Sequence, residues 1–223
     1  MFVDFIPIIE LIFMKPVKLL LLLLTSAMLF TSCVKKEYYN TQPEPVGYQN
    51  IFNDDFNYDN HNWSFSDPAN NAYVTVSNGT LKYVYMPAVK GTNTVAINTG
   101  ANMYHDFLLQ TSIQSNNSMG LVFGVSNGDY GYSFFIDDQG YFAVYKEGNA
   151  NTPYKALLDW QQSNAIKQGW NTVELEQVGN YWDGYINGTK VFEIQAQPLY
   201  GSKIGFIVPE NTTGYADYLT VQW

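Results

Sequence analysis

The feature that most constrains the fold is a succession of short alternating apolar and polar runs from Ile51 to Trp223. Alternation with a period of two places the apolar side chains on one face of a β-strand. Turn-forming residues interrupt these runs at spacings of about 8–12 residues, which is typical of a sandwich or barrel. Some interruptions are explicit hairpin signals, namely Asn78-Gly79, Asn127-Gly128-Asp129, Asp138-Gln139-Gly140 and Asn187-Gly188.

The pattern predicts an all-β domain over residues 50–223, a two-sheet antiparallel jelly-roll sandwich with roughly thirteen strands. An aromatic content of 17% agrees, because flat rings pack well on a pleated surface. Only Leu157–Lys167 is compatible with a helical turn, and it is too short to form a helix. The expected strands are Asn50–Phe56, Ala72–Val76, Thr80–Tyr85, Thr94–Asn98, Phe107–Gln114, Met119–Ser126, Tyr130–Asp137, Tyr141–Lys146, Trp170–Gln177, Tyr181–Ile186, Lys190–Ile194, Ser202–Val208 and Tyr215–Gln222.

The segment 14–33 has the layout of a secretory signal: two lysines, an apolar run and then small residues. The apolar run is shorter than the roughly 20 residues that a membrane-spanning helix needs. Residues 1–13 carry two acids and no base, so we expect translation to begin at Met14. We therefore predict a signal peptide over residues 1–32, of which residues 14–32 are translated if the start is Met14.

The end of this signal, Phe30-Thr31-Ser32-Cys33, resembles the lipobox of bacterial lipoproteins, with Phe30 where the family usually has Leu. The resemblance implies that Cys33 is lipidated and becomes the new N-terminus. The alternative is an ordinary signal with an incidental cysteine. Residues 33–49 are polar, contain two prolines and predict a flexible linker. We expect an exported protein at the outer membrane or cell surface that contacts the membrane only through its lipid.

The charge of the chain limits its partners. The net charge is −9 and every basic residue is Lys, so the side chains that neutralise phosphates are scarce. We expect no nucleic-acid partner and no direct binding to anionic lipid. An acidic surface is compatible with a neutral saccharide or glycan. The oligomeric state stays open.

An ordered set of motifs spans nearly the whole domain. It resembles the concanavalin A-like lectin/glucanase superfamily, in its laminin-G-like and 3-keto-disaccharide-hydrolase-like branch. The resemblance implies a two-sheet jelly roll whose first and last strands pair. The motifs are Asp54-Asp55-Phe56, Met119-Gly120-Leu121-Val122-Phe123-Gly124, Gly169-Trp170-Asn171-Thr172-Val173-Glu174-Leu175, Tyr185-Ile186-Asn187-Gly188, Gly201-Ser202-Lys203-Ile204-Gly205-Phe206 and Asp217-Tyr218-Leu219-Thr220-Val221.

No catalytic residue is predicted. Retaining glucanases of this superfamily carry a Glu-x-Asp-x-x-Glu strand, which is absent here. Glu174 and Glu176 share one face of a strand, and we expect that face to be solvated. Asp137-Asp138 ends a strand, where it is expected to cap the turn. No cofactor is expected, although a structural calcium ion held by Asp55 and Asp217 is conceivable if the first and last strands pair.

The remaining candidates are aromatic, because sugar rings stack on exposed aromatic faces while nearby polar groups bind their hydroxyls. The alternative is that these rings belong to the core. Trp170, which opens a strand, is expected in the core. The ligand-binding candidates are Trp63, Trp160, Trp182, Tyr132 and Tyr145.

Three functional hypotheses follow from these observations. The favoured one is a lipid-anchored module that binds carbohydrate or mediates adhesion without catalysis. The second is a glycoside hydrolase-like enzyme acting on a modified sugar, which needs a carboxylate of perturbed pKa in a cleft. The third is a structural envelope protein that binds another protein. The fold alone does not decide between them.

Overall fold

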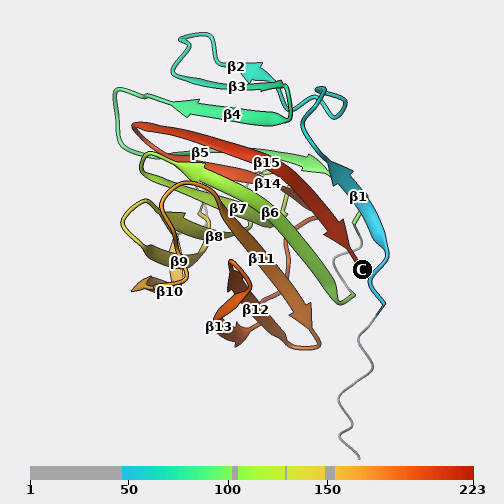
Figure 1. Ribbon diagram of the computed structural model, residues 1–223. Helices are drawn as coiled ribbons and strands as arrows, with labels where there is room; N and C mark the ends of the chain where they lie inside the picture. The colour runs from blue at the N-terminus through green and yellow to red at the C-terminus, as the bar shows by residue number, and fades with distance from the viewer. Residues whose placement is uncertain (1–46, 102–104, 129, 149–153) are drawn as a thin grey trace, which may run out of the picture. The chain divides into compact units, whose positions relative to one another are not determined.

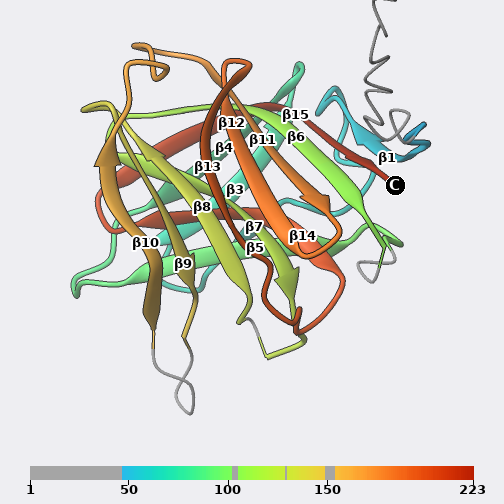
Figure 2. The same cartoon turned by 90° about the horizontal axis from the view of Figure 1, so that it is seen from below.

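Two antiparallel β-sheets lie face to face and enclose one apolar core (Figures 1 and 2). The computed structural model describes residues 47–101, 105–128, 130–148 and 154–223. These residues all belong to one unit, Gly47–Trp223. The described part of the chain forms fifteen strands and no helix, so no helix there is long and apolar enough to cross a membrane. The fold class is therefore the expected all-β sandwich.

The larger sheet has nine strands in the order β13-β12-β11-β6-β15-β4-β3-β2, with β1 also paired to β15. Its hairpins use the turn residues that the sequence indicates. Asn78-Gly79 and Asn187-Gly188 both adopt the positive φ values that tight hairpins require. The strands of this sheet are β1 (Asn50–Asp54), β2 (Phe65–Ser66), β3 (Ala72–Ser77), β4 (Thr80–Tyr85), β6 (Phe107–Ser115), β11 (Asn171–Val178), β12 (Tyr181–Ile186), β13 (Thr189–Gln195) and β15 (Thr212–Gln222).

The smaller sheet has six strands in the order β10-β9-β8-β7-β14-β5. Figure 2 shows β10, β9 and β8 side by side at one edge of this sheet. The strands are β5 (Thr92–Asn98), β7 (Ser118–Val125), β8 (Tyr132–Asp137), β9 (Tyr141–Lys146), β10 (Lys155–Gln162) and β14 (Lys203–Pro209).

The first and last strands pair, as the resemblance implied. Phe52 on β1 lies opposite Val221 on β15, and Asp54 lies opposite Leu219. The opposite edge of β15 pairs with β6 along most of its length. The last strand therefore lies in the interior of the larger sheet, where it joins β1 and β4 to β6.

The core between the sheets is rich in aromatic rings from both layers. Phe123 of the smaller sheet packs edge-on against Trp182 of the larger sheet, with ring centroids 4.9 Å apart. Tyr132 also contacts Trp182, at 4.8 Å. Edge-to-face contacts of this kind stabilise a core beyond the burial of apolar area.

A second apolar cluster lies on the other face of the smaller sheet. It consists of Val122, Val125, Phe135, Ala143, Tyr145 and Ile207. These residues alternate along β7, β8, β9 and β14 with core residues such as Leu121, Phe134 and Val144. Because side chains alternate across a strand, this cluster faces away from the sandwich core. Both faces of the smaller sheet are therefore apolar in part.

Two strands differ from the sequence-based expectation. β2 is only two residues long and pairs with β3, so its pattern is too short to recognise. β10 occupies part of the segment where we expected at most a helical turn. Its register against β9 shifts twice, between Ala156 and Leu158 and between Leu158 and Gln161. These bulges break the alternation that identifies a strand in sequence.

Candidate functional site

Four aromatic rings gather on the outward face of the smaller sheet. Phe135 on β8, Tyr145 on β9 and Trp160 on β10 have ring centroids 6.2–6.3 Å apart. Tyr154, just before β10, stacks on Tyr145 with centroids 4.6 Å apart and planes inclined by 26°. We call Phe135, Tyr145, Tyr154 and Trp160 the aromatic platform.

The strand register explains how these rings fit beside one another. Tyr145 lies between Ser133 and Ala156 on the neighbouring strands, and Phe135 lies opposite Ala143. On its other side Phe135 faces Gly120, where a Cβ atom would come within 3.1–3.2 Å of the ring. Large rings therefore alternate with small side chains, which leaves each ring room to lie along the sheet.

The platform is graded in exposure. Phe135 and Tyr145 are buried, whereas Trp160 is 40% exposed and Tyr154 is 55% exposed. The two outer rings therefore cover the two inner rings and present aromatic surface to solvent. An exposed aromatic surface supported by further rings is a rigid contact area with few rotamers to lose on binding.

A bulge in β10 brings a carboxylate to the platform. Between Leu158 and Gln161 the strand carries one more residue than β9 does between Val144 and Phe142. Asp159 and Trp160 both lie beside Tyr145 as a result. The Tyr145 hydroxyl donates to Asp159 Oδ1 at 3.5 Å, and the Trp160 ring lies 6.3 Å from the Tyr145 ring. A regular strand would place two consecutive side chains on opposite faces.

A second carboxyl group, that of Glu147, lies next to the same rings. Glu147 is buried and accepts a hydrogen bond from the Ser133 hydroxyl. Burial raises the pKa of Glu147, and the hydrogen bond from Ser133 partly opposes that shift. Burial also raises the pKa values of Tyr145 and Tyr154, so both phenols stay protonated at neutral pH.

The arrangement suits a flat ligand with hydroxyl groups. Trp160 and Tyr154 offer faces for C–H groups, whereas the Asp159 carboxylate and the hydroxyl of the exposed Tyr154 offer hydrogen-bonding groups at the rim. Two of the sequence-derived candidates, Tyr145 and Trp160, are brought together here. Phe135 and Tyr154 were missed. An exposed ring just ahead of an unrecognised strand gave no periodic signal for Tyr154.

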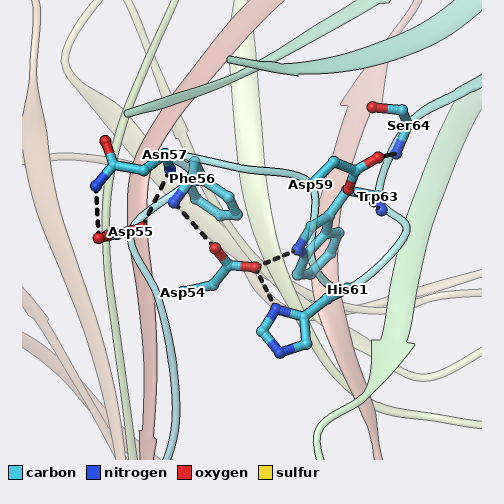
Figure 3. A network of polar contacts seen from close by, with 8 residues as sticks. All are labelled: Asp54, Asp55, Phe56, Asn57, Asp59, His61, Trp63 and Ser64. Atoms are coloured by element: carbon cyan, nitrogen blue, oxygen red, sulfur yellow. Dashed lines mark hydrogen bonds and ion pairs between the residues drawn. The ribbon is translucent and has the colours of Figure 1, made fainter. Parts of the chain in front are cut away.

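Trp63 is not available to a ligand, which corrects the sequence-based expectation. It is fully buried, and its indole N–H donates to Asp54 Oδ2 at 2.8 Å (Figure 3). Asp54 is itself buried and also accepts from the backbone N–H of Phe56 and contacts His61 Nδ1 at 2.6 Å. Trp63 therefore anchors the loop between β1 and β2 to the core.

Trp182 and Tyr132 are also core residues, which corrects the expectation for both. Trp182 is fully buried, and its N–H donates to Gln177 Oε1 at 2.8 Å. Tyr132 is 1% exposed, and its hydroxyl donates to the carbonyl of Pro198. Trp170 departs from expectation in the opposite direction, because it is 42% exposed rather than buried. Position near a strand end therefore did not distinguish exposed from buried indoles.

The paired acids lie away from the platform. Glu174 and Glu176 are on β11 of the larger sheet. Glu174 accepts a hydrogen bond from Gln110 at 2.9 Å and Glu176 accepts one from Tyr48 at 2.8 Å. Burial raises the pKa of Glu174. Both carboxylates are half-buried and engaged by neighbours, so this face is less solvated than we expected.

Asp137 caps the turn after β8, as expected, because its Oδ1 accepts from the backbone N–H groups of Gln139 and Tyr141 at 2.9 and 2.7 Å. Asp55 binds the Asn57 side chain and backbone. Among the residues that the structure describes, no group of three or more His, Cys, Asp or Glu side chains is placed to hold a metal ion. The expectation of no cofactor, with calcium between Asp55 and Asp217 as the alternative, stays a prediction. Cys33 lies outside the described residues.

Comparison with known proteins gives similarity of fold only. No family model matches the chain, and no curated protein matches its sequence. One similar structure is the CBM2 module of the evolved Dit protein of Lactobacillus casei BL23 phage J-1. It is 9% identical, with a TM-score of 0.53, over 79% of this chain and 96% of that module.

Two further similar structures have lower TM-scores. The carbohydrate-binding module CBM66 from Bacillus subtilis has a TM-score of 0.45 at 12% identity, covering 77% of this chain and 92% of the module. The Caenorhabditis elegans galectin LEC-6 has a TM-score of 0.42 at 13% identity, covering 61% and 92%. The phage module supports the sandwich fold and leaves the ligand open.

Proposed function

We propose that this protein is a carbohydrate-binding module that holds a neutral saccharide against the aromatic platform without transforming it. The observation that carries the proposal is a pair of half-exposed rings bordered by Asp159: Tyr154 stacks on the buried Tyr145, and Trp160 packs at an angle against Phe135 and Tyr145. The C–H face of a sugar packs on an aromatic face, while its hydroxyl groups bind carboxylate and phenol groups at the rim.

The expected affinity is low. A platform with two exposed rings gives little free energy beyond the cost of ordering the ligand, so we expect dissociation constants from micromolar to millimolar. The net charge of −9 favours neutral saccharides over anionic ones. Several copies of such a module on one surface bind a multivalent glycan with a higher overall affinity than a single module does, because the binding events are linked.

The finer assignment is also part of the proposal. The ordered motifs and the pairing of β1 with β15 support a concanavalin A-like domain of the laminin-G-like type. The lipobox-like segment ending at Cys33 supports a lipid-anchored protein of the outer membrane or cell surface. In this arrangement the linker of residues 33–49 tethers the binding module to the membrane.

The lipid anchor has a direct test. Mass spectrometry of the protein from its native membrane is expected to find an acylated Cys33 at the N-terminus. Cys33→Ala is expected to release the protein from the membrane or to leave its signal uncleaved. A cleaved Cys33→Ala protein that still partitions wholly with membranes would refute the lipid anchor.

The binding proposal is tested with the full chain, purified in mild detergent, on a glycan array followed by titration of the best hits. Trp160→Ala and Tyr154→Ala are each expected to weaken binding about three- to tenfold, the range for loss of one stacking partner. Tyr181→Ala is the control, because Tyr181 is an exposed ring on β12 of the larger sheet and lies outside the platform. If Trp160→Ala binds the array hits like the parent protein, the platform is not the site.

A hydrolase acting on a modified sugar is the second candidate, and one observation favours it. Glu147 is buried beside the platform and its pKa is raised, which is the condition of a general acid. Glu147→Gln separates the two functions. It leaves glycan binding within about twofold if the protein is a binding module. If the array hits are cleaved by the parent protein and not by Glu147→Gln, the enzyme is the correct assignment.

A further inference from the structure

A pocket opens at one end of the sandwich and shares no residue with the aromatic platform. Its volume is about 270 Å³. The floor consists of the buried apolar side chains Ile113, Met119 and Ile136. The polar side chains of Gln114, Asp138 and Lys167 also line it. The pocket therefore joins an apolar floor to a polar wall.

One wall of the pocket is held in place by the buried side chain of Asn171. Asn171 Oδ1 accepts from the backbone N–H of Lys167 at 2.8 Å. Its Nδ2 donates to the carbonyls of Lys167 and Gly169 at 2.8 and 2.9 Å. Asn187 Nδ2 adds a further hydrogen bond to Asn171 Oδ1, at 2.7 Å. The segment from Lys167 to Gly169 is thus fixed by side-chain contacts before any ligand arrives.

The turn between β8 and β9 forms another part of the lining, and its backbone is also held by a side chain. Asp137 Oδ1 fixes the turn through the backbone N–H groups of Gln139 and Tyr141. Gly140 has a φ of 91°, which a residue with a side chain rarely adopts. Asp138 also lines the pocket, and its Oδ1 accepts a 3.2 Å hydrogen bond from Gln139 Nε2. Two ordered walls make a preformed site.

The chemistry of the lining matches a sugar ring. Vicinal hydroxyl groups both donate and accept, so they pair with a wall that offers carboxylate acceptors beside ammonium and amide donors. Asp137, Asp138, Lys167 and Gln114 offer that mixture. The apolar floor suits the C–H face of the ring. The volume lies just below the roughly 300–1,000 Å³ of pockets for drug-sized ligands, so it fits one ring and not a chain.

We propose that this end pocket binds a single neutral sugar ring, as a second site that recognises the terminal residue of a glycan. The two carboxylates outnumber the one ammonium group, so a negatively charged sugar acid is disfavoured there. The choice of a sugar as ligand rests on the proposed function, whereas the pocket itself is built from different residues than the platform. The two sites therefore succeed or fail separately.

The test is ligand-observed saturation-transfer NMR with the full chain in detergent micelles. The probes are glucose, galactose, mannose and N-acetylglucosamine, with glucuronate as the anionic comparison and alanine as a zwitterionic one. At least one neutral sugar is expected to bind, and glucuronate is expected to bind more weakly. Asp138→Asn and Lys167→Met are each expected to reduce the affinity for that sugar about three- to tenfold, because each removes a charged hydrogen-bond partner.

Trp160→Ala is the control, because it removes one of the two exposed rings of the platform and no residue that lines the pocket. Sugar binding that persists in Trp160→Ala and falls in Asp138→Asn supports the pocket even if the platform fails. Binding that falls in Trp160→Ala and is unchanged in both pocket variants overturns the pocket and leaves the platform standing. Binding of alanine without any neutral sugar overturns the choice of ligand, as does the absence of any binding. Melting temperatures near the parent value confirm that the variants are folded.

Discussion

Replacing the tryptophans one at a time separates core from surface, because the chain places chemically identical rings in opposite environments. Trp182 is fully buried between Phe123 and Tyr132, whereas Trp160 is 40% exposed on the outward face of β10. Trp182→Ala removes a ring from the middle of the core. Large-to-small substitutions of this kind cost about 3–5 kcal/mol, because lost burial and an unfilled cavity add together.

Trp160→Ala is expected to cost less, about 1–2 kcal/mol. Part of the ring is in water already, and the space that it leaves opens to solvent and creates no closed cavity. For a domain of this size, 1 kcal/mol shifts the melting temperature by roughly 2–4 °C. Trp182→Ala should therefore lower it by about 6–20 °C, several times the effect of Trp160→Ala.

Urea unfolding followed by circular dichroism gives the free energy of unfolding of both variants. The values are compared where the dependence of that free energy on urea concentration is the same as in the parent. Trp182→Phe is the intermediate control, because it keeps an aromatic ring and loses the hydrogen bond to Gln177. It should fall between the parent and Trp182→Ala. Equal destabilisation by Trp160→Ala and Trp182→Ala would refute the distinction between platform and core. So would a Trp182→Ala protein that unfolds at the parent's midpoint.

Three further outcomes are expected. Deleting the last eight residues should unfold the domain, because β15 joins β1 and β4 to β6; a truncated protein that melts like the parent would exclude this pairing. Asp54→Ala should lower the free energy of unfolding by about 3 kcal/mol or more, because it leaves the Trp63 and Phe56 donors without their acceptor. Asp55→Ala loses hydrogen bonds to Asn57 and should lower it by about 1 kcal/mol. Glu147 has a raised folded-state pKa, so its protonated form contributes stability below the unfolded-state pKa of about 4.3, and that contribution is lost as pH rises through the folded-state pKa. Urea titrations at several pH values measure this loss of stability, and Glu147→Gln should abolish it. A Glu147→Gln protein with the same pH dependence of stability as the parent would contradict the raised pKa of Glu147.

The sequence predicts the strands whose alternation is regular and whose turns have Asn-Gly or Asp-x-Gly signals. β4, β9 and β12 match their expected ranges: β4 and β9 follow Asn78-Gly79 and Asp138-Gln139-Gly140, and β12 precedes Asn187-Gly188. β10 does not, because two bulges shift its register and its edge position leaves most of its residues exposed. Alternation in the sequence predicts which side chains face the core only where the strand register is continuous.

The candidate site was predictable only in part for the same reason. Tyr145 lies on a regular strand and Trp160 on an irregular one, and their proximity depends on the pairing of β9 with β10. The errors at Trp63 and Trp182 have a different origin. A tryptophan beside a polar loop looks exposed in sequence, yet Asp54 and Gln177 accept the indole N–H groups and allow both rings to be buried. The two acceptors lie nine and five residues away from their rings in the chain, and a local pattern does not show which polar side chain folds back onto which ring.

The bulge in β10 gives the platform a combination that a regular strand does not provide, a carboxylate and an indole from consecutive residues on one face. Deleting Asp159 is expected to restore one-to-one pairing between Leu158 and Gln161, with Trp160 opposite Ala143 and still facing outward. Glycan binding should then fall about three- to tenfold, as in Asp159→Ala, because both lose the same hydrogen-bond acceptor. Adding Trp160→Ala to the deletion should weaken binding again by a similar factor. If Trp160→Ala has no further effect in the deletion protein, the deletion has turned the indole away, and the bulge orients Trp160 rather than supplying Asp159.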